Sequence, residues 1–212
     1  MGDAPARESG LPIPGLAREV RLAGSPNDPR VENDEPAILE GCRRGEVSAF
    51  ERLFETHGAR MKSVAANLLG NVSDAEDAVQ ESFLKVYRGA AAFRGASRLS
   101  TWLYRVLLNT CYDVLRRRLR RPETPPPARG QEAVPALGDD HPLRLDLEAA
   151  VARLAPRRRM AFLLFEVEGF THREVAEILG VPEGNSRVLL HEAKRELQRL
   201  LSGTRPTREA RA

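Results

Sequence analysis

Apolar side chains recur every three or four residues over most of the chain, a spacing that predicts amphipathic α-helices. Early in this pattern, Gly45 and Gly58 are expected to divide the chain into short helices. Ser73 and Glu76 form an S-x-x-E capping box, which predicts the start of the next helix. The apolar face of that helix is expected to consist of Ala75, Val79, Phe83, Val86, Tyr87 and Ala90.

A further helix is predicted from Ser100 to about Arg118, after a short loop at 93–97. Its apolar face is formed by Leu99, Leu103, Val106, Thr110 and Val114. Its polar face is formed by Thr101, Arg105, Asn109, Tyr112 and Arg116. We therefore expect one side of this helix to be buried and the other to face solvent.

The C-terminal part of the chain predicts a compact set of helices. A helix over 143–154 is followed by Pro156, which suits the first turn of the next helix. Thr171 and Glu174 form a second capping box, and Gly180 suits a left-handed turn before the last helix. Two helices joined by a short turn that contains glycine are typical of the helix-turn-helix motif.

Clusters of proline and glycine divide the chain into an all-α protein with two small domains. The segment 1–35 has no helical or strand period and is expected to be a disordered tail, as is 203–212. The Pro-rich segment 120–142 is expected to be a flexible linker. It separates a helical domain at 36–119 from the helix-turn-helix domain at 143–202.

The placement of charge is more informative than its sum. The 212 residues include 33 basic and 30 acidic side chains, and a net charge of +3 does not by itself indicate a nucleic-acid partner. The segment 98–121, however, has seven arginines and one acid, Asp113, which gives a local charge of +6. Such a run is usually a solvated face, but the neighbouring Trp102 and Tyr104 either pack in the core or hold unstacked bases. Both interpretations stay open.

The sequence has no pattern that indicates catalysis. Phosphate-binding loops, dinucleotide-binding loops and nucleophile elbows are missing, and the four histidines are scattered. Cys42 and Cys111 lie far apart, which excludes a CxxC pair and favours buried apolar roles over redox sensing. We therefore expect no enzyme, cofactor, metal site or small-molecule substrate. Apolar runs too short for a membrane span and the lack of a secretory signal predict a cytoplasmic protein.

The predicted helix-turn-helix provides one candidate site. Residues at the start of its second helix meet base edges in the major groove. Arg187 can donate paired hydrogen bonds to guanine, and Asn185 can read adenine. Thr171 and Arg173, at the start of the first helix, are placed to contact phosphates. The full set at the second helix is Asn185, Ser186, Arg187, Val188 and His191. The alternative is a helical hairpin that only packs.

The polar face of the helix after Ser73 provides another candidate site. It presents Asp77, Gln80 and Glu81 opposite the apolar face. Such a face is commonly only a solvent-exposed surface, but it would also suit docking to a partner helix that carries arginines. The residue pattern alone leaves both interpretations open.

Three segments, in order along the chain, resemble the sigma-70 family of RNA polymerase sigma factors. Residues 74–88 (DAEDAVQESFLKVYR) resemble the helix that binds core polymerase. Residues 93–117 look like the segment that recognises the promoter −10 element, and residues 154–201 look like the −35-binding domain. Because no further domain lies between them, the chain is similar to the small extracytoplasmic-function (group 4) subfamily.

The resemblance implies roles for particular residues. Contact with the clamp helices of the largest polymerase subunit is implied for Asp77, Gln80 and Glu81. Capture of a flipped −10 base is implied for Phe93, Arg94, Gly95, Ala96 and Ser97, and tracking of that element for Arg105, Asn109 and Arg116. Recognition of the −35 element is implied for Arg187, Val188, His191 and Glu192. Glu192 departs from the basic or small polar residues common there; a carboxylate can accept from cytosine or repel phosphate.

The resemblance also implies a mechanism and partners. The chain would be a dissociable specificity subunit that binds core polymerase (clamp helices and flap) and promoter DNA, and that is restrained by an anti-sigma factor, often a membrane-tethered one. Two alternatives remain from the residues alone. One is a helix-turn-helix regulator that binds duplex operators without polymerase, which tight sequence-specific binding by the isolated chain would favour. The other is a helical adaptor that acts only through protein contacts.

Overall fold

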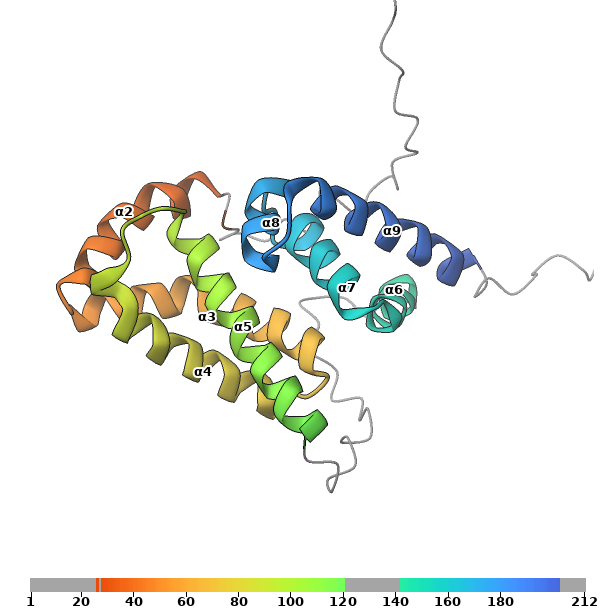
Figure 1. Cartoon of the computed structure of the whole chain (residues 1–212), viewed down its shortest axis with the longest axis horizontal. Coiled ribbons are helices and arrows are strands. Elements are labelled where there is room, and N and C mark those ends of the chain that lie inside the picture. The colour runs from red at the N-terminus through yellow and green to blue at the C-terminus, as the bar shows by residue number, and fades with distance from the viewer. Residues whose placement is uncertain (1–25, 27, 121–141, 203–212) are drawn as a thin grey trace, which may run out of the picture.

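The computed structural model describes residues 26, 28–120 and 142–202, and these form helices without any strand, as the all-α prediction requires. An N-terminal group consists of α2 (Pro29–Arg43), α3 (Val47–Leu69), α4 (Val72–Gly89), the 3₁₀ turn η1 (Ala90–Ala92) and α5 (Leu99–Arg120). A C-terminal group consists of α6 (Pro142–Arg153), α7 (Pro156–Phe162), the π-helical turn η2 (Leu163–Val167), α8 (His172–Leu179) and α9 (Glu183–Ser202). Figure 1 shows the two groups side by side.

Helix α2 begins at Pro29, ahead of the domain boundary that the sequence predicts at residue 36. The Asp28 carboxylate accepts a hydrogen bond from the backbone N–H of Arg30 at 2.9 Å, and Pro29 occupies a first-turn position where a missing N–H costs little. The helix also continues through Pro36. The predicted disordered tail therefore extends too far. Its first 25 residues lie outside the described part of the chain, as do 121–141 and 203–212.

Helix α3 is continuous, so the prediction that Gly58 ends a helix was wrong. Gly58 is buried, and a Cβ added there would lie 3.3 Å from the ring of Phe54, which explains a small residue at this position. Gly45 does separate α2 from α3, with a φ of +74° that favours glycine.

Helix α4 is capped by Asn71, whose side chain accepts a hydrogen bond from the backbone N–H of Asp74 at 3.0 Å. The capping box predicted at Ser73 is therefore not the cap of this helix.

The helix-turn-helix is formed as predicted. The capping box at the start of α8 is present: the backbone N–H of Thr171 donates to Glu174 Oε2 at 2.8 Å, and that of Glu174 donates to Thr171 Oγ1 at 3.3 Å. Gly180 ends α8 with a φ of +64°, and α9 begins three residues later at Glu183. This geometry is local, because the capping box and a left-handed glycine fix where α8 begins and ends.

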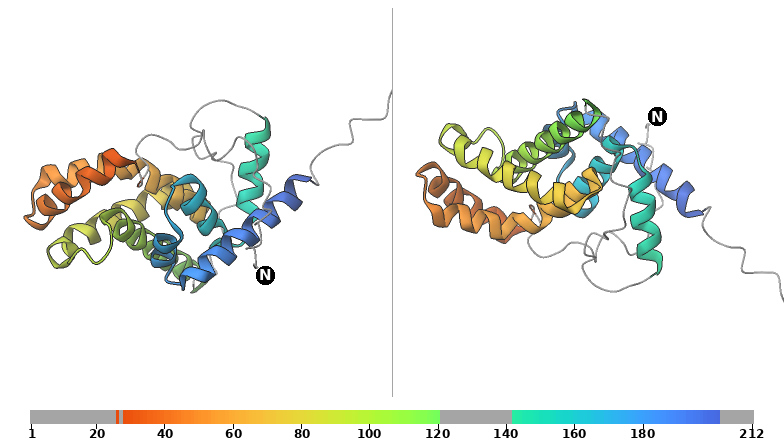
Figure 2. Two further views of the ribbon diagram at one scale, coloured as in Figure 1. Left: turned by 90° about the horizontal axis from the view of Figure 1, so that it is seen from above. Right: turned by 90° about the horizontal axis from the view of Figure 1, so that it is seen from below.

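The two helical groups pack against each other, chiefly through α5 and α8, as Figures 1 and 2 show. Tyr104 of α5 is fully buried and meets the ring of Phe170 edge-on, with 4.9 Å between centroids. Its hydroxyl donates a 2.7 Å hydrogen bond to Glu168 Oε2. The guanidinium of Arg60, from α3, lies 3.4 Å from the same oxygen. Burial raises the pKa of Glu168, and it raises that of Tyr104 well above its ordinary value.

A second ionic contact crosses the same interface. Arg98, just before α5, lies 3.4 Å from a carboxylate oxygen of Glu174 on α8 and 3.7 Å from one of Glu35 on α2. Both carboxylates are buried, so these pairs are little screened by solvent. The interface between the groups therefore combines an aromatic contact with buried charge, and Arg98 links a carboxylate of α8 to one of α2.

Candidate functional site

The predicted docking residues lie on the outer face of α4. Asp77 and Gln80 are exposed. Glu81 is half-buried, and its carboxylate lies 3.0 Å from Lys85 Nζ. At helical spacing, the line that begins with Asp77 and Gln80 continues through Leu84 to Tyr87. The polar stripe thus extends into an apolar one.

An exposed aromatic surface lies beside this stripe, and the sequence did not reveal it. Phe50 and Tyr87 are 4.7 Å apart between ring centroids, and Phe54 and Phe83 are 5.0 Å apart. Phe54 is 52% exposed, and Leu84 and Tyr87 are each 54% exposed. We call these five residues the α3–α4 aromatic patch. Monomeric proteins seldom leave such a contiguous apolar surface uncovered unless it binds another molecule.

The patch corrects the predicted inner face of α4. The side chains that point into the core are Ala75, Ala78, Val79, Ser82 and Val86. Tyr87, which the spacing had placed in the core, is exposed, and Phe83 lies at the edge. One signal was present in the sequence: the large apolar residues of this helix cover more than the single stripe that a surface helix needs.

The loop 93–97 is anchored at its first residue and exposed at its tip. The ring of Phe93 stacks on Trp102 with 4.4 Å between centroids and an interplanar angle of 11°. The backbone carbonyl of Phe93 accepts hydrogen bonds from Arg43 of α2. Residues 94–96 are exposed, and Gly95 has a φ of +72°. The loop is therefore a supported projection, and Trp102 supports it as a half-buried packing residue.

Helix α5 presents the remaining residues predicted near the loop. Arg105 is half-buried, whereas Asn109 and Arg116 are exposed. Thr101, expected on the same polar face, is fully buried instead. Towards the end of the helix, a shallow hollow is lined by Asp113, Arg116, Arg117 and Arg120. A concentration of guanidinium groups around a hollow suits an anionic ligand such as a phosphate.

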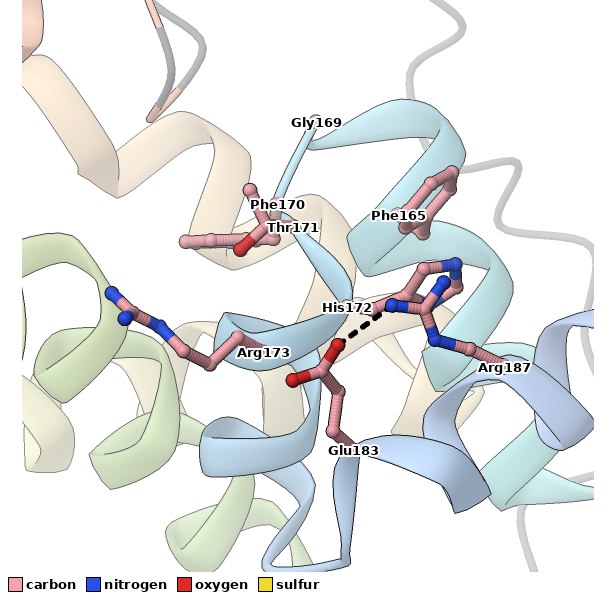
Figure 3. A pocket seen from close by; sticks show the side chains of 8 residues that line it. All are labelled: Phe165, Gly169, Phe170, Thr171, His172, Arg173, Glu183 and Arg187. Carbon is pink, nitrogen blue, oxygen red and sulfur yellow. Dashed lines mark hydrogen bonds and ion pairs between the residues drawn. The ribbon is translucent and has the colours of Figure 1, made fainter.

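A second hollow lies between the starts of α8 and α9 (Figure 3). Thr171, the N-cap of α8, and Arg173 of α8 line it, together with Arg187 of α9. The guanidinium of Arg187 is held by Glu183, with 2.7 Å between Nη2 and Oε1. His172, which sequence reasoning did not select, stacks on Phe165 at 4.3 Å and thereby joins α8 to η2.

The predicted recognition residues divide into two sets. Four are exposed along the outer face of α9, namely Asn185, Arg187, Val188 and His191. Ser186 is buried instead, with its hydroxyl 3.1 Å from His172 Nδ1. Glu192 is half-buried and accepts a 2.9 Å hydrogen bond from Arg158 of α7. The structure therefore directs Ser186 and Glu192 toward other parts of the protein.

The cysteines have surroundings that suppress thiol chemistry. Both are free and buried. Burial, assisted by the charge of Glu46, raises the pKa of Cys42 to about 11, and burial raises that of Cys111 to about 12. Since the thiolate is the reactive form, both behave as small apolar groups near neutral pH.

In the described residues no group of three or more His, Cys, Asp or Glu side chains could hold a metal ion. No helix among them is long and apolar enough to span a bilayer.

Comparison with known proteins gives concordant matches. The family Sigma-70 region 2 matches residues 53–121, and Sigma-70, region 4 matches residues 144–197. The ECF RNA polymerase sigma factor SigM of Mycobacterium tuberculosis is 30% identical over 174 residues, which cover 81% of this chain and 87% of that protein. RNA polymerase sigma factor CarQ of Myxococcus xanthus is 32% identical over 167 residues, covering 77% and 95%. The sigma factor RpoE from Bartonella quintana, solved in complex with the anti-sigma factor NepR, superposes with a TM-score of 0.62 at 26% identity, covering 75% and 100%.

Proposed function

Because the chain belongs to the sigma-70 family, in its extracytoplasmic-function group, we propose that it directs transcription initiation through three surfaces of its own. The outer face of α4 binds core polymerase. The loop 93–97 and α5 hold the unwound −10 strand, and α8 and α9 bind the −35 duplex. Such a protein is a specificity subunit and not an enzyme. The observation that carries the proposal is the match of both family regions to the helices that present these surfaces.

Contacts with core polymerase are assigned to the line from Asp77 to Tyr87. Its polar end suits a basic partner helix, and its aromatic end supplies the buried area that dominates binding at protein interfaces. The clamp helices of the largest subunit are the partner that the family resemblance implies. The α3–α4 aromatic patch supports this assignment, because an uncovered apolar surface is stabilised when a partner buries it.

The −10 assignment rests on an exposed loop next to a basic helix. Separating stacked base pairs costs on the order of 1.4 kcal/mol per step, and stacking of a captured base on protein returns roughly 1–3 kcal/mol. The loop tip at 94–96 is accessible, and Arg105 and Arg116 follow along α5 to contact the strand's phosphates. Promoter opening then needs no nucleotide hydrolysis, because the chain binds the open state more tightly than the closed one.

The −35 assignment gives a prediction for Arg187. Its ion pair with Glu183 is solvent-exposed, so exchanging that partner for a base costs little. Arg187→Ala is expected to remove about 1–3 kcal/mol of preference at one base pair of the −35 element. Binding of the chain with core polymerase to promoter fragments that differ at single −35 positions measures this loss. Arg195→Ala, an exposed arginine farther along α9, is the control. An unchanged profile for Arg187→Ala would show that the register of the recognition helix is different.

Reconstituted transcription tests the proposal as a whole. Competent core polymerase with the purified chain is expected to give specific transcripts from a cognate promoter, and core alone is not. Start sites mapped after overexpression identify the promoters for this assay. If no genomic fragment yields a specific transcript, the proposed function is wrong. Tight binding to duplex DNA without core would instead indicate a polymerase-independent regulator.

An anti-sigma factor is the further partner that we include in the proposal. The support is the Bartonella quintana relative, which was solved in complex with such a protein. A partner of this kind is expected to lower the yield of specific transcripts in the reconstituted assay. A titration in which candidate inhibitors leave transcription unchanged would count against each of them.

A further inference from the structure

Arg43 holds the start of the loop 93–97 from a distant part of the chain. Its Nε and Nη2 both donate to the backbone carbonyl oxygen of Phe93, at 3.1 Å and 2.6 Å. The arginine lies in the last turn of α2, fifty residues earlier in the sequence, and its side chain is 33% exposed. A charged donor that grips one carbonyl with two N–H groups is among the stronger hydrogen bonds in proteins.

The same guanidinium also lies beside the loop tip. A Cβ added to Gly95 would be 3.8 Å from Arg43 Nη2. Phe93, whose carbonyl is gripped, closes η1 through a 3.2 Å backbone hydrogen bond to Ala90 and stacks on Trp102. The loop is thus fixed at one end by Arg43 and Trp102 and at the other by the start of α5. A loop that is already ordered loses less conformational entropy when it binds a ligand.

We propose that Arg43 is a positioning residue for −10 recognition: by fixing the carbonyl of Phe93, it sets the conformation in which the loop 93–97 selects an extruded base. This inference rests on the proposed function of that loop. Arg43 acts through Phe93 and does not itself contact DNA. Its effect is therefore on base preference, whereas an arginine that contacts a phosphate affects all sequences equally.

The first test uses the free chain and no DNA. Trp102 is the single tryptophan of the protein, and its ring stacks on that of Phe93. Its fluorescence therefore reports on the first residue of the loop. Arg43→Gln is expected to increase acrylamide quenching of Trp102 and to shift its emission to the red. Arg44→Gln is the matched control, because the neighbouring Arg44 is exposed and its guanidinium pairs with Glu40 and Glu46 beside it in the chain. Equal quenching in wild type and Arg43→Gln would overturn the proposal.

The second test measures base selection by the full chain bound to core polymerase. The probes are labelled single strands that carry a −10 element, with all four bases at each position. Arg43→Gln is expected to reduce the preference for the favoured base by about tenfold, because a charged hydrogen bond that orders the loop is lost. Arg43→Lys, which keeps the charge but cannot grip with two N–H groups in the same fork, is expected to recover part of it. Arg44→Gln is expected to bind like wild type.

The possible outcomes distinguish a failure of the role proposed for Arg43 from a failure of the proposed −10 recognition. Arg43→Gln could weaken binding equally for all four bases and reduce the slope of log K against log [salt] by about 0.7. In that case Arg43 contacts a phosphate, and the positioning role is wrong. If quenching changes but base preference does not, Arg43 is only structural and the proposal is again overturned. If wild type with core shows no base preference at any −10 position, the proposed function itself fails. Circular dichroism and −35 duplex binding confirm that each variant is folded, and Arg43→Lys provides the test should Arg43→Gln not fold.

Discussion

Replacement of Asp77 by arginine is expected to lower the affinity of the chain for core polymerase by about a hundredfold. Asp77 lies on the exposed face of α4, at the polar end of the line that continues to Tyr87. A positive charge at this place opposes a basic partner, and juxtaposed like charges at an interface cost several kcal/mol. The fold is expected to survive, because the side chain is in solvent. Titration of labelled chain with core polymerase measures the affinity.

Asp34→Arg is the matched control for this variant. Asp34 is exposed on α2, and its replacement by arginine changes the net charge by the same amount as Asp77→Arg. Non-specific repulsion from core polymerase would therefore appear in both variants. Gln80→Ala is expected to weaken binding less, since it removes one neutral polar group without adding repulsion. Wild-type affinity for Asp77→Arg would show that core polymerase binds elsewhere, whatever becomes of the two DNA-binding assignments.

Acidification is expected to destabilise the chain through His57, which is buried in α3. Burial, followed by the positive charges of Arg60 and Arg98, lowers the pKa of His57 to about 4 from an ordinary value of 6.5. Between these two values the unfolded chain binds a proton that the folded chain excludes. The stabilising effect of a neutral His57 is therefore complete above pH 6.5 and is lost as the pH falls towards 4. It amounts to about 3 kcal/mol, which urea unfolding at a series of pH values measures.

His57→Phe isolates this contribution. Neither ring nitrogen of His57 has a hydrogen-bond partner among the described residues, so phenylalanine removes the titration without breaking a bond. The free energy of unfolding of this variant is expected to depend less steeply on pH between 4 and 6.5. Glu168 acts in the opposite direction, because its raised pKa gives stability that is lost as the pH rises, but it is present in both proteins and cancels. Exposed His191→Phe is the control. If the free energy of unfolding depended on pH in the same way in wild type and His57→Phe, the assignment to His57 would be wrong.

Features set by neighbouring residues could be predicted from the sequence. Helical periodicity, the Thr171–Glu174 capping box and the left-handed Gly180 depend on contacts within a few positions, and each is found in the structure. The helix-turn-helix followed from them. The exposed positions of Arg187 and His191 followed in turn, because a helix with one buried stripe turns its other side to solvent.

Features set by distant residues could not be predicted in this way. Tyr87 satisfied the spacing of a core position but is exposed, and its ring packs on Phe50 of α3 at the surface. Ser186 satisfied the spacing of a base-reading position but turns inward to His172. The hydrogen bonds from Arg43 to Phe93 join residues fifty positions apart, and no period or motif indicates such a pair. The roles of the predicted docking and DNA-binding residues stay predictions.

The contact between α5 and α8 sets a condition on how a promoter is read. The −10 and −35 elements are separated by about 25 base pairs, or roughly 85 Å of duplex at 3.4 Å per step. Tyr104 packs on Phe170 and is hydrogen-bonded to Glu168, so the helices assigned to these two elements touch. In this arrangement they lie much closer together than the two elements do on a straight duplex. Reading both elements together requires the two halves to separate, and the work of separation is subtracted from the affinity for DNA. A polymerase that holds the halves apart supplies that work, and the free chain has no equivalent source.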